Sequence, residues 1–306
     1  MINVFGHTSP DTDATCSAII WAWYLNEHTS MEATPRVLGE LNTETQFVLA
    51  KWDTKAPALL EEIVAGEEVV IVDTNNPQEL PEGINQATIL QIIDHHKLVG
   101  GIETNGPIDI TMRPVACTAT VLHDLIGEPI EDLPKDIAGL MLSCILSDTL
   151  GFRSPTTTPH DKDVAESLAE HLAIDIEIYA NEMFAAKSDV SAFSDKGLLI
   201  LDSKKYDVGG TNFRVSVLET TTPETILSRK DALVEAMTTL KEEEADVDEI
   251  LLFVIDIFNE EATVFTPNTL TKEVIAKSFG VKVESDTEIL PGIISRKKQI
   301  LPSLTL

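Results

Sequence analysis

The sequence predicts an α/β protein in which a mostly parallel N-terminal sheet flanked by helices is followed by a smaller C-terminal α+β domain. Residues 1–187 alternate short β-branched runs with helical patterns, which is typical of βαβ units around a parallel sheet. From residue 196 the pattern changes to a hairpin and then to a mixture of strands and helices. At 306 residues the chain exceeds the roughly 250 residues at which a single core stops growing, so two domains are expected.

The N-terminal domain, residues 1–187, is expected to contain four strands and several helices. The strands are predicted from apolar, β-branched runs at residues 2–6, 36–39, 68–74 and 87–94. Apolar residues recur at helical spacing at residues 14–25, 56–66, 118–126, 135–146 and 161–173. The alternation of strands with helices predicts crossover connections and therefore parallel strand pairing.

A polar stretch with small residues at 188–195 predicts the linker, and residues 196–306 form the second domain. Its first element is a hairpin over residues 197–220, because Gly209 and Gly210 supply the turn. The remaining elements are predicted as a helix at 224–243, strands at 249–257 and 262–266, a helix at 270–278 and a strand before residue 292. This mixture indicates an α+β domain.

The composition argues against several classes of function. A net charge of −29 is unsuited to a general nucleic-acid or membrane-surface binder, because both depend on basic patches that attract phosphate. Cys16, Cys117 and Cys144 lie in apolar, helical contexts without CxxC spacing, and we expect them to be reduced core residues. The N-terminus shows no leader pattern and no run of about 18 apolar residues occurs, so we expect a cytoplasmic protein.

Polar side chains follow three strands of the predicted sheet, at the point where each strand ends. The first strand ends at His7, the third at Asp73 and the fourth at Asp94, His95 and His96. Ligands of such sheets bind at the carboxyl edge of the strands. Three separate segments therefore bring side chains that can bind a metal to one edge.

Each of these side chains also has a plainer explanation. Asp13 could cap the helix that follows it, Asp11 could complete an Asx turn, and His7 could be a solvated histidine at a strand end. A cap at Asp13 explains neither of the other two, so the group as a whole favours a metal site. Asp148 follows a strongly apolar helix, where the helix dipole disfavours an anion, and it is either an exposed loop residue or a carboxylate that needs a cation.

The adjacent histidines give a sharper signal. His95 and His96 come directly after a buried strand, and their side chains would point to opposite sides if that strand continued. One could then bind a metal while the other faces a substrate; the alternative is two loop histidines beside a turn residue, Asp94.

Four carboxylates and two imidazoles would complete a two-metal site if they share one cleft. The six residues are His7, Asp11, Asp13, Asp73, His95 and Asp148. The carboxylates balance two divalent ions, and the imidazoles shift the preference toward Mn²⁺ and later transition metals. Two ions about 3.5 to 4 Å apart can hold a bridging water, lower its pKa and direct the resulting hydroxide at phosphorus.

Five motifs taken together resemble a known family. In chain order they are GHTSPDTDA at 6–14, VDTN at 72–75, DHHK at 94–97, SDT at 147–149 and SRKKQ at 295–299. Their order along essentially the whole chain is similar to the manganese-dependent (family II) inorganic pyrophosphatases of the Asp-His-His phosphoesterase superfamily.

The resemblance implies a role for each motif residue. One metal would be bound by His7, Asp11, Asp73 and Asp148. The second would be bound by Asp13, Asp73, His95 and Asp148, so that Asp73 and Asp148 bridge. His96 would face the substrate and donate a hydrogen bond or proton toward the leaving phosphate, with Asp94 as an orienting residue rather than a ligand.

The C-terminal domain would supply the cations that hold phosphate. By the same resemblance these are Arg296, Lys297 and Lys204, with Lys205 as the alternative to Lys204. SRKKQ could instead be a solvated basic loop, but it contains the only run of three basic residues in the chain. The active site would then lie between the domains, and domain closure would assemble it and exclude water.

The expected function is hydrolysis of pyrophosphate to two phosphates by a homodimer with two Mn²⁺ per chain, Co²⁺ as a substitute, and Mg²⁺ accompanying the substrate. An exopolyphosphatase of the same superfamily is the first alternative, and the intact His96 favours the pyrophosphatase. An oligonucleotide phosphodiesterase would be expected to carry a GGGH-like motif, which is absent. A non-catalytic Mn²⁺-binding protein would have no use for Arg296, Lys297 and Lys204.

Overall fold

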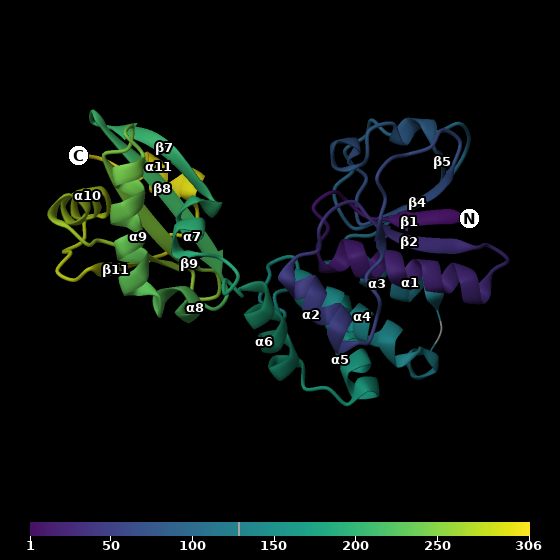
Figure 1. The fold of residues 1–306 in the computed structure, drawn as a ribbon. Helices are drawn as coiled ribbons and strands as arrows, with labels where there is room; N and C mark the ends of the chain where they lie inside the picture. The colour runs from purple at the N-terminus through teal and green to yellow at the C-terminus, as the bar shows by residue number, and fades with distance from the viewer. Residues whose placement is uncertain (128) are drawn as a thin grey trace. The chain divides into compact units, whose positions relative to one another are not determined.

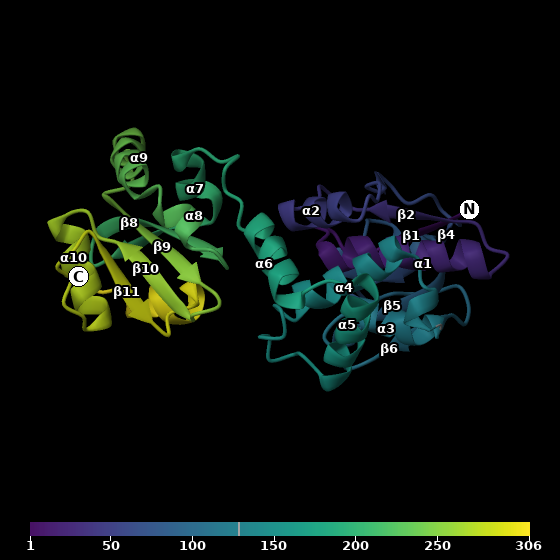
Figure 2. The same cartoon turned by 90° about the horizontal axis from the view of Figure 1, so that it is seen from below.

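The structure is a computed structural model that describes residues 1–127 and 129–306, the side chains of Lys297 and Lys298 excepted. The chain divides into two compact units, Met1–Ala186 and Lys187–Leu306. Figures 1 and 2 show the elements of each unit from two directions. Each unit is described by itself below.

The first unit is built on a six-stranded sheet in which every pair of neighbours is parallel. The strands are β1 Ile2–Phe5, β2 Ala33–Val37, β3 Ala58–Leu59, β4 Glu68–Val72, β5 Thr88–Asp94 and β6 Asp109–Met112, in the order β3-β2-β1-β4-β5-β6. The predicted parallel sheet is confirmed. The two strands that the sequence did not indicate, β3 and β6, are short edge strands with exposed or half-buried residues, so they lack the apolar run that marks a central strand.

Helices form two layers on one face of this sheet. They are α1 Thr12–His28, α2 Thr43–Lys51, α3 Thr118–Ile126, α4 Lys135–Asp148, α5 Pro159–Leu172 and α6 Ile176–Lys187, with a 3₁₀ turn at Ile130–Asp132. α1 packs on β1 and β2, α3 packs on β5, and α4 lies between α1 and α5. Because α4 is enclosed on all sides, its residues 137–147 are all buried, which explains why this stretch contains no charged residue.

The other face of the sheet is covered by turns and loops, among them the 3₁₀ turns Pro77–Glu79 and Ile84–Gln86. The predicted helix at 56–66 is wrong. Ala58 and Leu59 pair with β2, and Leu60 and Ile63 pack against the apolar cluster on this face. Burial of these side chains against the sheet therefore outweighed the local helical periodicity.

The second unit has a five-stranded mixed sheet in the order β11-β10-β9-β8-β7. Its strands are β7 Ser203–Val208, β8 Thr211–Thr220, β9 Glu249–Asp256, β10 Glu261–Phe265 and β11 Thr287–Pro291. Only β8 and β9 pair in parallel. The helices are α7 Asp195–Leu201, α8 Glu224–Leu227, α9 Lys230–Glu243, α10 Thr269–Phe279 and α11 Leu301–Ser303, with one π-helical turn at Arg296–Ile300.

Two details of the second unit differ from the sequence prediction. The hairpin turns at Gly209 and Gly210, both with positive φ, but it begins at Ser203, because residues 195–201 form α7 with Ser194 as its N-cap. The single helix expected at 224–243 is two helices. Arg229 lies between them and is tied by its guanidinium to Asp195 and to two backbone carbonyls.

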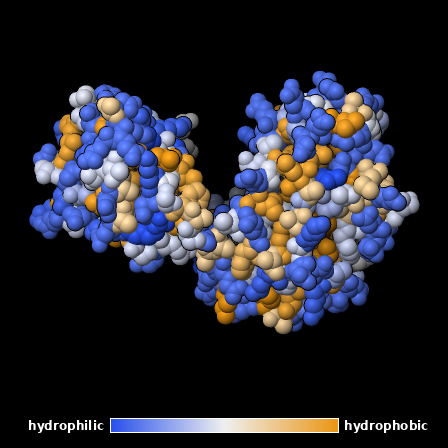
Figure 3. All heavy atoms as spheres, viewed as in Figure 1, coloured by the Kyte–Doolittle hydropathy of each residue, from blue (hydrophilic) through white to orange (hydrophobic). Residues whose placement is uncertain are grey.

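Separate apolar cores lie on the two faces of the second sheet. Leu251, Phe253 and Ile255 of β9 belong to one core, and the alternate residues Ile250, Leu252 and Val254 belong to the other. Hydrophilic residues dominate the face of each unit visible in Figure 3, with hydrophobic ones in smaller groups. In the described part of the chain, no helix combines the length and apolarity needed to cross a bilayer.

Candidate metal centre

The carboxyl ends of three adjacent strands carry four of the predicted site residues of the first unit. β1, β4 and β5 are neighbours in the sheet, and each ends at one of the motifs. His7 follows β1, Asp73 follows β4, and His95 and His96 follow β5. The parallel topology thus brings residues nearly 90 positions apart in the chain to one edge.

The loop between β1 and α1 is tightly constrained. A Cβ added to Gly6 would lie 2.6 Å from the Cβ of Ala14, so only glycine lets the end of β1 approach the first turn of α1 this closely. Asp11, not Asp13, is the N-cap of α1 and accepts a hydrogen bond from the Ala14 N–H at 3.0 Å. The explanation of Asp13 as a simple cap is therefore wrong.

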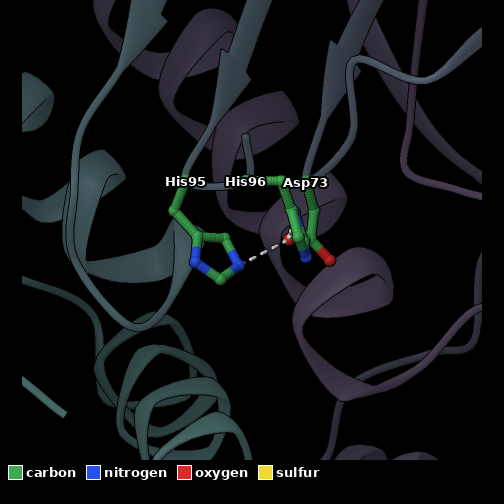
Figure 4. Close-up of side chains that lie close together, drawn as sticks. All are labelled: Asp73, His95 and His96. Carbon is green, nitrogen blue, oxygen red and sulfur yellow. Dashed lines mark ion pairs between the residues drawn. The ribbon is translucent and has the colours of Figure 1, made fainter. Parts of the chain in front are cut away.

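Asp73 lies at the centre of the group and has an unusual backbone. Its φ is 59°, a left-handed conformation that costs free energy in a residue other than glycine. One carboxylate oxygen lies 3.3 Å from Nε2 of His95 (Figure 4), and the other lies 3.5 Å from Nε2 of His7. This single buried carboxylate therefore reaches both histidines.

The two adjacent histidines have different surroundings. β5 ends at Asp94, and the two rings lie 4.2 Å apart rather than on opposite sides. His95 is 13% exposed, and its Nδ1 lies 3.1 Å from the Val115 carbonyl. Its buried Nε2 makes no hydrogen bond with any of the described residues. His96 is 53% exposed, and its Nδ1 lies 2.9 Å from a carboxylate oxygen of Asp94. Thus His95 points into the centre, while His96 presents its ring to solvent.

Asp13 and Asp148 form a second carboxylate group beside Asp73. Oxygens of both lie within 4.8 Å of each other and of the Cys117 sulfur. Asp148 is the last residue of α4, and one of its oxygens lies 3.8 Å from Nε2 of His95. The expectation of reduced, buried cysteines is confirmed for all three, but the sequence did not indicate that Cys117 lies next to the carboxylates.

The predicted metal ligands fall into three groups, two of which share Asp73, and within each group the ligand atoms lie within 4.8 Å of one another. Among the described residues these groups are Asp73 with His95 and His96, His7 with Asp11 and Asp73, and Asp13 with Cys117 and Asp148. Since Asp148 also lies near His95, all six predicted residues belong to one connected cluster.

Crowding of negative charge shifts the pKa values in this cluster. Burial raises the pKa of Asp13 to about 7, and the charge of Asp73 adds to the effect. Burial together with Asp13 and Asp73 also holds the pKa of Asp148 well above its ordinary value. Burial opposes the protonated forms of His7 and His95, but the neighbouring aspartates outweigh it and raise their pKa values to about 11 and about 9. The aspartates of the cluster therefore carry more negative charge than the two histidines neutralise.

The donor set fits divalent metal ions. Carboxylates that raise one another's pKa values, and a buried imidazole nitrogen without a hydrogen bond, are groups that a cation would stabilise. Oxygen ligands with two imidazoles suit Mn²⁺ and neighbouring transition metals. His95 also has its other ring nitrogen on a backbone carbonyl, the usual arrangement of a metal-binding histidine.

The cations expected to hold phosphate lie in the second unit. Arg296 contacts Asp202, with a guanidinium nitrogen 2.7 Å from a carboxylate oxygen, and so lies near the start of β7. Lys204 lies in β7, two residues after Asp202, and it has no ion-pair partner among the described residues. Lys205, by contrast, pairs with Glu244 and Asp246. The side chain of Lys297 lies outside the described part of the structure.

Comparisons with known proteins agree over nearly the whole chain. Residues 1–145 match the N-terminal domain of the DHH family, and residues 181–306 match the DHHA2 domain. A protein of Bacillus licheniformis named "Probable manganese-dependent inorganic pyrophosphatase" is 37% identical over 303 residues, which cover 99% of this chain and 97% of that protein. The chain belongs to the manganese-dependent, family II inorganic pyrophosphatases.

A solved structure supports the same family II assignment. The crystal structure of Methanococcus jannaschii "putative family II inorganic pyrophosphatase" has a TM-score of 0.63 and 36% identity, covering 99% of this chain and 98% of that one. An exopolyphosphatase-related protein from Bacteroides fragilis has a TM-score of 0.50 at 13% identity over 98% of this chain and 89% of that one, a likeness of fold alone.

Sequence reasoning missed two residues that support the centre in this family II chain. Thr118, at the start of α3, donates its backbone N–H to Asp13 at 2.6 Å and its hydroxyl to Asp73 at 3.0 Å. Asn75 donates to Asp94 at 2.5 Å and so holds the residue that contacts His96. Asn75 is part of the VDTN motif, but nothing in the local pattern singles out Thr118.

Proposed function

We propose that the chain is a hydrolase that converts inorganic pyrophosphate to two phosphates at a two-metal centre in the first unit. The observation that supports this most directly is the connected cluster of four aspartates and two histidines, in a chain of the family II pyrophosphatases. The relatives bear the name of this activity, and the cluster provides a chemistry that suits it.

Two ions would be held by the residues that the motifs assign. His7 and Asp11 would belong to one ion and Asp13 and His95 to the other, with Asp73 and Asp148 shared. Such ions supply a water of lowered pKa as nucleophile and positive charge for the phosphate oxygens. In this arrangement Asp73 is the shared ligand best supported by geometry, because its two oxygens face different histidines.

His96 would act on the substrate rather than on a metal. Its Nδ1 is held by Asp94, which raises the pKa of the ring, and about half of its side chain is exposed. A protonated imidazole fixed at one nitrogen can donate its other N–H to the leaving phosphate. Asp94 would orient this ring and is itself held by Asn75.

Arg296 and Lys204 of the second unit would bind the phosphate groups, together with Lys297. Lys205 is the weaker candidate, since it is already paired with two carboxylates. We propose that these cations meet the metal centre when substrate is bound, because a chain of net charge −29 needs local positive charge to hold a tetra-anion. A homodimer and a cytoplasmic location remain predictions; sedimentation of the purified chain tests the former.

The metal preference follows from the imidazoles. We expect micromolar Mn²⁺ or Co²⁺ to activate the metal-free protein, whereas Mg²⁺ at millimolar levels accompanies the substrate. Equal activation by micromolar Mg²⁺ alone would contradict the assignment of His7 and His95 as ligands.

A phosphate-release assay with Mn²⁺ and Mg²⁺ tests the function. We expect rapid hydrolysis of pyrophosphate and little of long-chain polyphosphate or a dinucleotide, and no turnover by Asp73→Ala. Preferential release from long polyphosphate would support the exopolyphosphatase alternative. Binding of two Mn²⁺ without hydrolysis of any of the three substrates would indicate a non-catalytic metal-binding protein.

A further inference from the structure

Asp161 is a fully buried carboxylate outside the metal centre that the proposed chemistry does not use. It lies in the first turn of α5, and its oxygens accept hydrogen bonds from two parts of the chain. Thr158 donates its backbone N–H at 2.9 Å and its hydroxyl at 2.6 Å. Ala116 donates its backbone N–H at 3.0 Å, and Thr120 donates its hydroxyl at 2.7 Å.

The contacts with Thr158 are those of a helix capping box and need no further explanation. The contacts with Ala116 and Thr120 serve no cap of α5. They cross more than 40 residues to reach the segment that joins β6 to α3 and the first turn of α3. Asp161 thus ties that segment, residues 113–119, to α5.

The 113–119 segment contacts three of the predicted metal ligands. The Val115 carbonyl lies 3.1 Å from Nδ1 of His95. The backbone N–H groups of Thr118 and Ala119 donate to Asp13 at 2.6 and 3.2 Å, and the Thr118 hydroxyl donates to Asp73 at 3.0 Å. Ala116, the residue held by Asp161, lies between Val115 and Thr118 in sequence, so a shift at Ala116 moves the partners of all three ligands.

We propose that Asp161 is a positioning residue of the metal centre, which acts through the 113–119 segment to orient His95 and Asp13. The inference rests on the proposed function, in which these two residues bind the same ion. Outer contacts of metal ligands typically change metal affinity by 10- to 100-fold when they are lost. Asp161 does not contact a metal ligand directly. It holds residues 113–119, and this segment contacts both His95 and Asp13, so the loss of Asp161 affects two ligands of one ion.

Asp161→Asn is the variant that tests the proposal. The amide keeps the volume of the side chain but replaces one acceptor oxygen by an NH₂ group, so at least one of the four donors loses its partner. Thr158→Ala is the matched control, because it removes the capping hydroxyl of the same helix and leaves the contacts of Asp161 with Ala116 and Thr120 in place. Thr120→Val is a milder second variant in case Asp161→Asn does not fold.

Calorimetric titration of Mn²⁺ into the metal-free proteins is the first measurement. We expect Asp161→Asn to bind the ion of Asp13 and His95 about 10- to 100-fold more weakly than the parent, and the other ion to weaken by a smaller factor because, of the three ligands that the 113–119 segment contacts, it shares only Asp73. Thr120→Val should change the affinity for the first ion by a smaller factor, and Thr158→Ala should bind both ions like the parent. If Asp161 served only to cap α5, Asp161→Asn would lower the unfolding temperature but would not change the affinity for one Mn²⁺ more than the affinity for the other.

The second measurement is a proton NMR spectrum of the Co²⁺-loaded proteins, in which a histidine N–H close to Co²⁺ gives a shifted, exchangeable resonance. His95→Ala identifies the resonance of His95 Nδ1–H, which we expect to exchange with solvent faster in Asp161→Asn than in Thr158→Ala. Two results would overturn the proposal. One is that Asp161→Asn has the Mn²⁺ affinities and the His95 proton exchange rate of the parent. The other is that Thr158→Ala shows the same changes as Asp161→Asn. A parent that binds fewer than two Mn²⁺ would instead overturn the proposed metal centre, and this inference with it.

Discussion

Asp13→Asn should change the stability of the protein in opposite directions with and without metal. Asp13 is fully buried and accepts hydrogen bonds from the Thr118 and Ala119 N–H groups and the Ser17 hydroxyl. Burial and the Asp73 charge raise its pKa from 3.8 to about 7, so at pH 8 the metal-free protein holds an unfavourable charge there. Holding this charge at pH 8 destabilises the folded, metal-free protein by about 4 kcal/mol.

Asparagine removes that charge but accepts hydrogen bonds with one oxygen only. A buried N–H left without its acceptor costs about 1 to 3 kcal/mol. The variant should therefore be roughly 1 to 3 kcal/mol more stable than the parent at pH 8 without metal, which for a unit of this size is an increase of about 2 to 10 °C in unfolding temperature.

The pH dependence has a definite sign. Because the folded-state pKa is raised, Asp13 of the parent takes up a proton as the pH falls below about 7, and this uptake adds roughly 3 kcal/mol to the stability between pH 8 and pH 5. Asp13→Asn lacks this proton uptake. Its advantage over the parent should disappear near pH 5, where the lost hydrogen bond offsets the roughly 1 to 2 kcal/mol of burial penalty that the parent still has.

With Mn²⁺ the order should reverse. Each ion bound at 100 times its Kd stabilises the folded state by about 2.7 kcal/mol, and the variant loses a ligand of one ion. Thermal unfolding with EDTA and with saturating Mn²⁺ measures both effects, and Asp136→Asn, an exposed aspartate in α4, controls for net charge. If Asp13→Asn lowered the unfolding temperature equally in both conditions, Asp13 would be an ordinary hydrogen-bond acceptor.

Three further predictions test other parts of the molecule. Gly139→Ala should destabilise by about 1 to 3 kcal/mol rather than stabilise α4, because the added Cβ would lie 2.1 Å from the Trp52 ring; chemical denaturation measures this, and a gain in stability would contradict the packing. Arg296→Lys should lower kcat/KM for pyrophosphate about 30- to 1000-fold while metal binding is unchanged, since lysine lacks the planar guanidinium fork that holds two phosphate oxygens in parallel; activity within about threefold of the parent would argue against this role. His95→Ala should weaken one Mn²⁺ and Asp73→Ala both, and titrations that show two parental sites in each would refute the ligand assignment.

Much of the fold was predictable from local patterns. The helix at 118–126 has the bounds that its apolar spacing predicts, and the central strands follow from β-branched runs that are buried on both faces. The predictions of secondary structure are wrong where the local sequence pattern and the tertiary packing favour different structures. Residues 56–66 have helical spacing but serve as an edge strand and as cover for the sheet.

The sequence by itself determined which residue types could form the metal centre, because strand ends carry His7, Asp73 and His95 and a regular parallel sheet places such ends together. Only the tertiary structure decided how they are held. Asp13 bonds to Thr118 across 105 residues, and Asp161 reaches Ala116 across 45. Periodicity and turn chemistry act over a few neighbouring residues, whereas these hydrogen bonds form only after α3 and α5 have packed into place, so no local pattern could indicate them.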